Sequence, residues 1–270
     1  MKQLILAIAL LVSLSDCTQK TTKVFHQSTS RSITSLDYSL NSVLWQQRSG
    51  EYRALCYQAF ALAKMQLQEM IRQKPVSSKP LAIITDIDES VLDNSPQQAH
   101  DLLNHQLYTP ESWKAWTALA RAKALPGAVE FFQFANQNGV QIFYISNRNA
   151  DELEATIQNL KQTGFPQADA QHVIMKGSSS DKEPRRLAVA EKHQVAMLIG
   201  DNLNDFDKRF YQQDATQRSA LVDAHHQDFG TRFIVLPNAI YGDWESAIWN
   251  ARPVSPKVAD KLKHEALESY

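Results

Sequence analysis

The stretch at residues 81–93 constrains the fold more than any other part of the chain. It begins with apolar, partly β-branched residues that run without a polar interruption up to Thr85, and it then reaches Asp86, Asp88 and Glu89. An apolar run of this length predicts a strand buried on both faces, as in parallel sheets. Open α/β sheets bind ligands at the carboxyl ends of their strands, so these carboxylates are expected to line a site.

Asp86 and Asp88 are two residues apart, so they project to the same side if the extended geometry continues. Two carboxylates this close repel each other unless one is protonated or a cation lies between them. The pattern therefore predicts a metal site, and the oxygen ligands favour Mg²⁺. A strand end followed by an acidic, solvated turn is the alternative when this motif is taken alone.

Apolar runs and helical segments alternate along the rest of the chain. The expected strands are residues 140–145, 172–175, 195–199 and 232–236, and the expected helices between them are residues 126–139, 150–162 and 184–193. This alternation predicts an α/β fold with a mostly parallel sheet and right-handed crossovers. Residues 36–72 are expected to form two helices that break near Gly50, with Cys56 as a small core residue. Residues 94–124, with a helical run at 113–123, are expected to form an insert over the site.

The N-terminus predicts export. Lys2 precedes an apolar run at residues 4–12 that is too short to span a bilayer and fits a secretory signal. Residues 14–17 resemble a bacterial lipobox, which predicts a signal peptide at 1–17 and a lipid on Cys17, although Asp16 departs from the pattern; an uncleaved or fortuitous cysteine is the alternative. Residues 18–35 then form a polar tether. The net charge of -1 gives no indication of nucleic-acid binding, which normally requires an excess of basic residues.

Polar groups follow three of the expected strands, and a loop adds a cation. Together they suit phosphoryl transfer, which needs a nucleophile, a proton donor and positive partners for the phosphoryl oxygens. Each has a plainer alternative: a helix cap for the serine, a solvated side chain for the lysine and a turn at residues 200–202. The set comprises Asp86, Asp88, Ser146, Asn147, Lys182, Asp201 and Asp205.

The order of these residues carries a resemblance to a known family. Residues 86–92, 146–148, 182 and 200–206 are similar to the four motifs of haloacid dehalogenase (HAD) type phosphohydrolases. More closely, residues 36–247 resemble the class C acid phosphatases, the lipoprotein e family of bacterial outer-membrane proteins. The resemblance implies one domain at 36–270, with a three-layer α/β core at 80–93 and 126–250, accessory helices at 36–75 and a cap at 94–125.

The resemblance also implies a role for each motif residue. Asp86 would be the nucleophile that forms an aspartyl-phosphate, and Asp88 would be the general acid and base. Mg²⁺ would be held by the Asp86 carboxylate, the Asp88 main-chain carbonyl and Asp201. Ser146 and Lys182 would bind the phosphoryl group. Three further residues would support this inner set from behind: Asp205, Asn147 and Asn202.

The implied substrate is a small phosphomonoester, such as a 5'-nucleotide or NMN. Tyr241 would stack on one face of the base, whereas Gln97 stands where the family places a second tyrosine. Trp113 or Trp116 would replace it, and packing between cap and core is their alternative role. The implied location is the outer membrane or periplasm of a Gram-negative bacterium. A binding protein without turnover and a phosphotransferase are the competing functions, and the oligomeric state is open.

Overall fold

The structure is a computed structural model that describes residues 35–73 and 79–270, and these residues belong to one compact unit. The predicted signal peptide at 1–17, with Cys17, and residues 18–34 of the predicted tether lie outside the described residues. Among the helices that are described, none combines the length and apolar character needed to cross a membrane.

The centre of the fold is a parallel sheet of five strands in the order β5-β4-β1-β6-β7. Each predicted strand is present, and β1 lies in the middle because both of its faces are apolar and buried. The residues that follow β1 therefore emerge at the centre of the sheet's carboxyl edge. The strands are β1 (Leu81–Thr85), β4 (Gln141–Ile145), β5 (Val173–Ile174), β6 (Gln194–Gly200) and β7 (Phe233–Val235).

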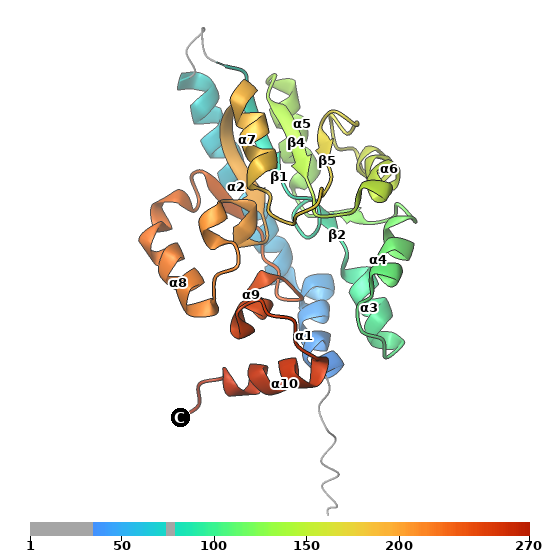
Figure 1. Cartoon of the computed structure of the whole chain (residues 1–270). Helices are drawn as coiled ribbons and strands as arrows, with labels where there is room; N and C mark the ends of the chain where they lie inside the picture. The colour runs from blue at the N-terminus through green and yellow to red at the C-terminus, as the bar shows by residue number, and fades with distance from the viewer. Residues whose placement is uncertain (1–34, 74–78) are drawn as a thin grey trace, which may run out of the picture. The chain divides into compact units, whose positions relative to one another are not determined.

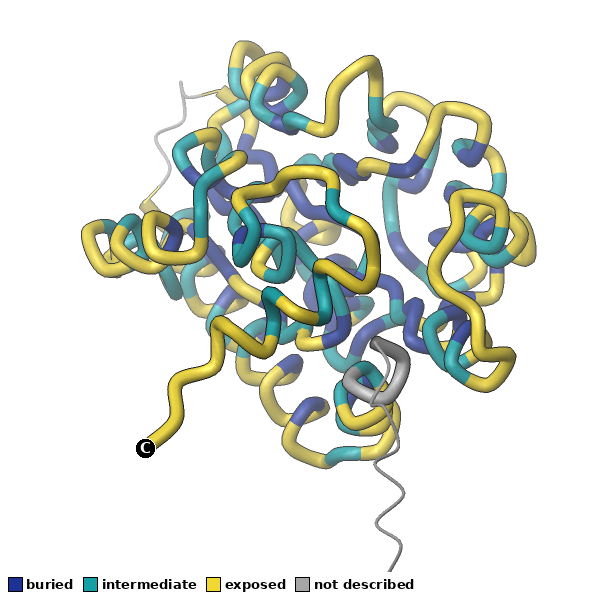
Figure 2. The backbone as a smooth tube through the Cα atoms, turned by 60° about the horizontal axis from the view of Figure 1, so that its bottom comes forward, coloured by how far each residue is buried: buried dark blue, intermediate teal, exposed yellow. Residues whose placement is uncertain are grey.

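Helices cover both faces of the sheet and make a three-layer α/β core, as expected (Figure 1). Ile83 points into a core cluster shared with α2, α5 and α6, whereas Ile84 points into a second cluster shared with α7 and α8. Figure 2 shows the buried backbone running through the interior of this unit. The helices on the first face are α2 (Gly50–Gln73), α5 (Ala128–Gln137) and α6 (Leu153–Thr163), and those on the second are α7 (Glu183–Lys192) and α8 (Ala215–Ala224).

The helix boundaries follow the glycines and prolines for the most part. Gly127, at φ 84°, precedes α5, and Gly164, at φ 93°, ends α6, so both adopt the left-handed conformation that glycine favours. Ser49 separates α1 (Ser35–Arg48) from α2, one residue before the predicted break. Cys56 is fully buried in α2, which confirms its predicted place in the core.

The predicted insert is a helical cap. It leaves the core through β2 (Leu92–Asp93), contains α3 (Ser95–Leu103) and α4 (Pro110–Thr117), and returns through β3 (Lys123–Ala124), which pairs with β2 in antiparallel fashion. The predicted helix at 113–123 is wrong in both boundaries. The Thr109 hydroxyl accepts a hydrogen bond from the Ser112 amide at 3.0 Å and starts the helix early, and Ala120 has a positive φ that ends the helical path.

The remaining elements are short, and most lie at the carboxyl edge or near the C-terminus. They are five 3₁₀ segments, η1 (Ala150–Glu152), η2 (Leu203–Asp205), η3 (Lys208–Phe210), η4 (His226–Asp228) and η5 (Ala247–Trp249), with α9 (Asp243–Ser246) and α10 (Pro256–Glu265).

Candidate active site

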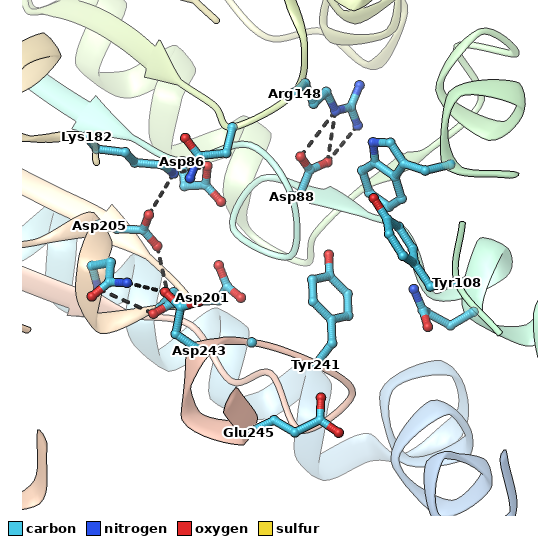
Figure 3. A pocket seen from close by; sticks show the side chains of 16 residues that line it. Asp86, Asp88, Tyr108, Arg148, Lys182, Asp201, Asp205, Tyr241, Asp243 and Glu245 are labelled. Carbon is cyan, nitrogen blue, oxygen red and sulfur yellow. Dashed lines mark hydrogen bonds and ion pairs between the residues drawn. The ribbon is translucent and has the colours of Figure 1, made fainter. Parts of the chain in front are cut away.

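A cavity of about 490 Å³ opens at the carboxyl edge of the sheet (Figure 3). Its wall contains most of the residues that the sequence analysis singled out, although they come from segments more than 150 residues apart. The segments after β1 and β6 and the helix α9 supply acidic residues, and the start of α7 supplies a lysine. The cap and the loop before α9 supply aromatic rings. The predicted residues in the wall are Asp86, Asp88, Trp113, Asn147, Lys182, Asp201, Asn202, Asp205 and Tyr241.

Three carboxylates gather at one end of the cavity. One oxygen from each of Asp86, Asp201 and Asp205 lies within 4.8 Å of the other two. Asp86 directly follows β1, and its amide donates to the Ile199 carbonyl at 2.9 Å, so the pairing of β1 with β6 continues up to this residue. Because Asp201 directly follows β6, the register of the two strands brings both carboxylates to the same edge.

Lys182 lies within this cluster and is 6% exposed, so the alternative of a solvated loop lysine is wrong. Its Nζ donates to Oδ1 of Asp86 and, at 2.6 Å, to Oδ1 of Asp205. Burial lowers the pKa of Lys182, but the two carboxylates outweigh this and hold it above its ordinary value. Asp205 therefore contacts Lys182 directly, and its supporting role stays a prediction.

One lysine does not compensate the charges of three clustered carboxylates. Burial raises the pKa of Asp86 to about 7 despite the attraction of Lys182, with further contributions from Asp205 and Asp88. Burial, followed by repulsion from Asp205 and Asp86, also holds the pKa of Asp201 well above its usual range. A divalent cation with oxygen ligands would relieve this repulsion, so the donor set fits a metal ion.

Gly200 lets Asp205 approach the end of β6. A Cβ atom at position 200 would lie only 2.4 Å from Oδ2 of Asp205 and 2.5 Å from its Cβ. The Asn202 amide donates to the same Oδ2 at 3.0 Å and holds the carboxylate in this position. The glycine of the fourth motif is therefore a requirement of packing.

Asp88 belongs to a second group, separate from the three-carboxylate cluster (Figure 3). The guanidinium of Arg148 donates to its Oδ1 through Nη2 at 2.7 Å and Nε at 3.0 Å, and Asn94 donates to the same oxygen at 2.8 Å. The Arg148 side chain is 1% exposed. Burial lowers the pKa of Arg148, but Asp88 holds it above its ordinary value. Arg148 was not predicted as a site residue, although its position directly after Ser146 and Asn147 was a signal.

Ser146 lies beneath the cavity wall and is fully buried. Its Oγ accepts a hydrogen bond from the Arg148 amide at 3.0 Å and faces Oδ2 of Asp88 at 3.4 Å. The alternative that Ser146 caps the next helix is wrong, because Asn149 is the N-cap of η1. Contact between Ser146 and a phosphoryl oxygen stays a prediction.

Aromatic rings form the wall of the cavity beyond Asp88. Tyr108 and Trp113 pack at 6.4 Å between ring centroids, and the Arg148 guanidinium lies 5.7 Å from the Trp113 ring. Trp116 is directed elsewhere, since its indole donates to Asn94 at 2.8 Å. Gln97 is buried and donates to Asp101 at 2.6 Å, so it does not line the cavity. Tyr108 was not predicted to line the cavity, because it lies far from the first motif in the sequence and belongs to no motif.

Tyr241 lines the cavity wall as well, and its hydroxyl donates to the carboxyl group of Glu89. Glu89 is fully buried and also accepts from the Asn94 amide at 2.7 Å. Burial, together with the nearby charge of Asp88, raises the pKa of Glu89 to about 8. Tyr241 is thus held by a buried hydrogen bond that the sequence analysis did not anticipate.

Known proteins resemble the chain in both sequence and fold. The family model described as HAD superfamily, subfamily IIIB (acid phosphatase) matches residues 3–244. The class C acid phosphatase from Bacillus anthracis has a TM-score of 0.84 and 38% identity, over 87% of this chain and 98% of that chain. A structure of that enzyme with tungstate bound gives the same values. The class B acid phosphatase of Xenorhabdus bovienii (strain SS-2004) is 23% identical over 146 residues, and the match spans 59% of its length.

The five-stranded parallel core, with acidic residues at its carboxyl edge, has the architecture of HAD-type phosphatases. Within that class, the chain belongs to the acid phosphatases of subfamily IIIB, a family of phosphoric monoester hydrolases. The resemblance to class C acid phosphatases that the motifs carry is confirmed.

Proposed function

We propose that the chain is an exported acid phosphatase that hydrolyses small phosphomonoesters with Mg²⁺, through an aspartyl-phosphate on Asp86. The observation that carries this proposal is that two groups of polar side chains line the same cavity. One group is Asp86 with Lys182 and Asp201, and the other is Asp88 with Arg148. The first group suits attack on phosphorus, and in the second Asp88 is the carboxyl group placed to give a proton to the leaving oxygen, with Arg148 fixing its orientation.

Each step then falls to a side chain of this site. A carboxylate oxygen of Asp86 attacks phosphorus, the bond from phosphorus to the ester oxygen breaks, and Asp88 gives that oxygen a proton. In the second half, Asp88 takes a proton from water, and the water oxygen attacks phosphorus and releases Asp86. Mg²⁺, held by Asp86, the Asp88 main-chain carbonyl and Asp201, would neutralise charge so that an anionic phosphate can approach. Lys182 offsets charge on the phosphoryl oxygens.

The cavity wall supports a substrate with a flat leaving group. Trp113 and Tyr108 stand on the cap, Tyr241 comes from the loop before α9, and all three line the same cavity as Asp88. Aromatic side chains bind flat rings through stacking. We infer that 5'-nucleotides, NMN and aryl phosphates are substrates. A class C relative binds tungstate, a tetrahedral oxyanion like phosphate, which supports a phosphate ester as the substrate.

The proposed location depends on the N-terminal sequence alone. The apolar run at 4–12 and the lipobox-like residues before Cys17 favour an exported protein anchored in the outer membrane through a lipid. Expression with a labelled fatty acid tests the anchor: wild-type chain should take up label and the Cys17→Ala variant should not. Equal labelling of both chains would contradict the proposed anchor.

The central test compares hydrolysis of p-nitrophenyl phosphate, AMP and NMN, with Mg²⁺ and with EDTA. Asp86→Asn should reduce kcat by more than about a thousandfold, as expected when a nucleophile is lost. The matched control is Asp223→Asn, an exposed aspartate of α8, which should leave kcat unchanged. Activity that survives Asp86→Asn would eliminate the mechanism.

Acid quenching with ³²P-labelled substrate should trap label on wild-type protein and none on Asp86→Asn. Adding an alcohol acceptor such as glycerol separates hydrolysis from phosphotransfer. A hydrolase releases inorganic phosphate at an unchanged share of the total product, whereas a phosphotransferase forms glycerol phosphate in its place.

A further inference from the structure

Two consecutive arginines, Arg185 and Arg186, stand in the first turns of α7, just after Lys182. Their guanidinium groups reach two different loops of the site. We propose that they are positioning residues with different effects: Arg185 fixes the loop at 146–147, which serves phosphate binding, and Arg186 fixes the loop at 204–205, whose Asp205 belongs to the three-carboxylate cluster beside the proposed Mg²⁺ ligands. This inference rests on the proposed function of those two loops.

Arg185 bridges from α7 to the loop that follows β4. Its Nη1 donates to the Ser146 carbonyl at 2.7 Å, and its Nη2 donates to Oδ1 of Asn147, also at 2.7 Å. The planar guanidinium thus holds the main chain of one residue and the side chain of the next in a fixed relation. Ser146 is expected to bind the phosphoryl group and Asn147 to support it, so Arg185 sets the distance of this pair from Lys182.

Arg186 makes the equivalent contact with the loop that follows β6. Arg186 is 5% exposed, and its Nη1 donates to the carbonyl of Asn204 at 2.7 Å and to that of Asp205 at 3.0 Å. Its Nη2 donates to Glu183, which belongs to the same helix. The main chain at Asn204 and Asp205 is therefore hydrogen-bonded to α7 through Arg186. Asp205 in turn belongs to the three-carboxylate cluster.

The separation of the two effects follows from helix geometry. Successive residues of an α-helix point about 100° apart, because one turn contains about 3.6 residues. One turn can therefore reach the loops after β4 and after β6, which lie on either side of β1 in the sheet. Lys182, at the N-cap of the same helix, touches Asp86 and Asp205 between these loops. If the arginines only stabilised the packing of α7, loss of either one would lower the affinities for Mg²⁺ and for phosphate to the same extent.

The test measures two probes separately on the full chain. Inorganic phosphate is used as a competitive inhibitor at saturating Mg²⁺, and Mg²⁺ itself is titrated by calorimetry without phosphate. Loss of hydrogen bonds from a charged group predicts a change of about tenfold in affinity. Arg185→Met should weaken competitive inhibition by inorganic phosphate by about tenfold and raise KM. Its Mg²⁺ affinity should stay within about twofold of wild type. Arg186→Met should lower Mg²⁺ affinity by about tenfold, which Arg185→Met should not, and it should also weaken phosphate inhibition because Asp205 contacts Lys182.

Arg209→Met is the matched control, because Arg209 is partly exposed and pairs with Asp207 outside the cavity wall; it should change neither probe. If Arg186→Met does not fold, Arg186→Lys replaces it, since lysine keeps the charge but lacks the planar fork. Wild-type Mg²⁺ affinity in Arg186→Lys would overturn the role of Arg186.

Equal effects of the two arginine variants on both probes, or no effect on either, would also overturn the inference. A wild-type chain that binds neither Mg²⁺ nor phosphate would instead refute the proposed function, so the two failures can be distinguished.

Discussion

Substituting Gly200 by alanine should displace Asp205 and weaken metal binding. The added Cβ would meet Oδ2, Cβ and Cγ of Asp205 at 2.4, 2.5 and 2.7 Å. Rotation of the Asp205 side chain cannot remove the contact with its Cβ, which is fixed to the main chain of η2. The loop must therefore move. Overpacking of this kind costs about 1–3 kcal/mol, which lowers Tm by about 2–12 °C in a domain of this size.

The assay is thermal unfolding together with the Mg²⁺ dependence of p-nitrophenyl phosphate hydrolysis. Gly177→Ala is the matched control, because a Cβ at that position meets no heavy atom of the described residues within 4 Å, and it should keep wild-type Tm and activity. In an Asp205→Gly background, Gly200→Ala should cost little, since all three close atoms are absent. The reasoning is refuted if Gly200→Ala has wild-type Tm and Mg²⁺ dependence, or if its cost persists in that background.

Two further predictions concern the cavity wall and its buried support. Trp113→Ala should lower kcat/KM for AMP and p-nitrophenyl phosphate by about fivefold, from loss of about 1 kcal/mol of stacking, but should not lower it for glycerol phosphate; equal losses for all three would contradict the aromatic wall. The Glu89 carboxyl has a pKa of about 8 in the folded chain against an ordinary 4.5, so folding favours its protonated form and the free energy of unfolding falls as pH rises from about 4.5 to about 8. Glu89→Gln should remove this part of the decline, measured by denaturant unfolding in EDTA at pH 5 and pH 8, and identical slopes for the two chains would refute it.

Much of the core could be predicted from the sequence because its strands are buried on both faces. Such strands are unbroken apolar runs, and the residues that follow them must meet at one edge of a parallel sheet. That rule was sufficient to predict that Asp86, Asp201 and Asp205 lie close together at this edge. Their chemical roles stay predictions.

The contacts within the loops could not be predicted in the same way. Arg148 reaches Asp88 because of the direction in which the loop turns after β4, and Arg185 reaches the same loop from α7. No periodic pattern in the sequence encodes either contact. The cap helix α4 was misplaced for a similar reason, because its start depends on a side-chain cap at Thr109 and its end on the backbone at Ala120. Such local hydrogen bonds compete with propensity and are seen only once the chain is folded.

The pairing of β2 with β3 has a consequence for how members of this architecture can diverge. Leu92 lies directly opposite Ala124, so the chain departs for the cap and comes back at neighbouring points of the backbone. Because the cap joins the core at one place and packs on α1 through its helix α3, changes in the loop between α3 and α4 can leave the catalytic edge in place. Substitutions selected for new substrates can therefore accumulate in the cap residues that line the cavity, while the residues at the carboxyl edge of the sheet stay unchanged.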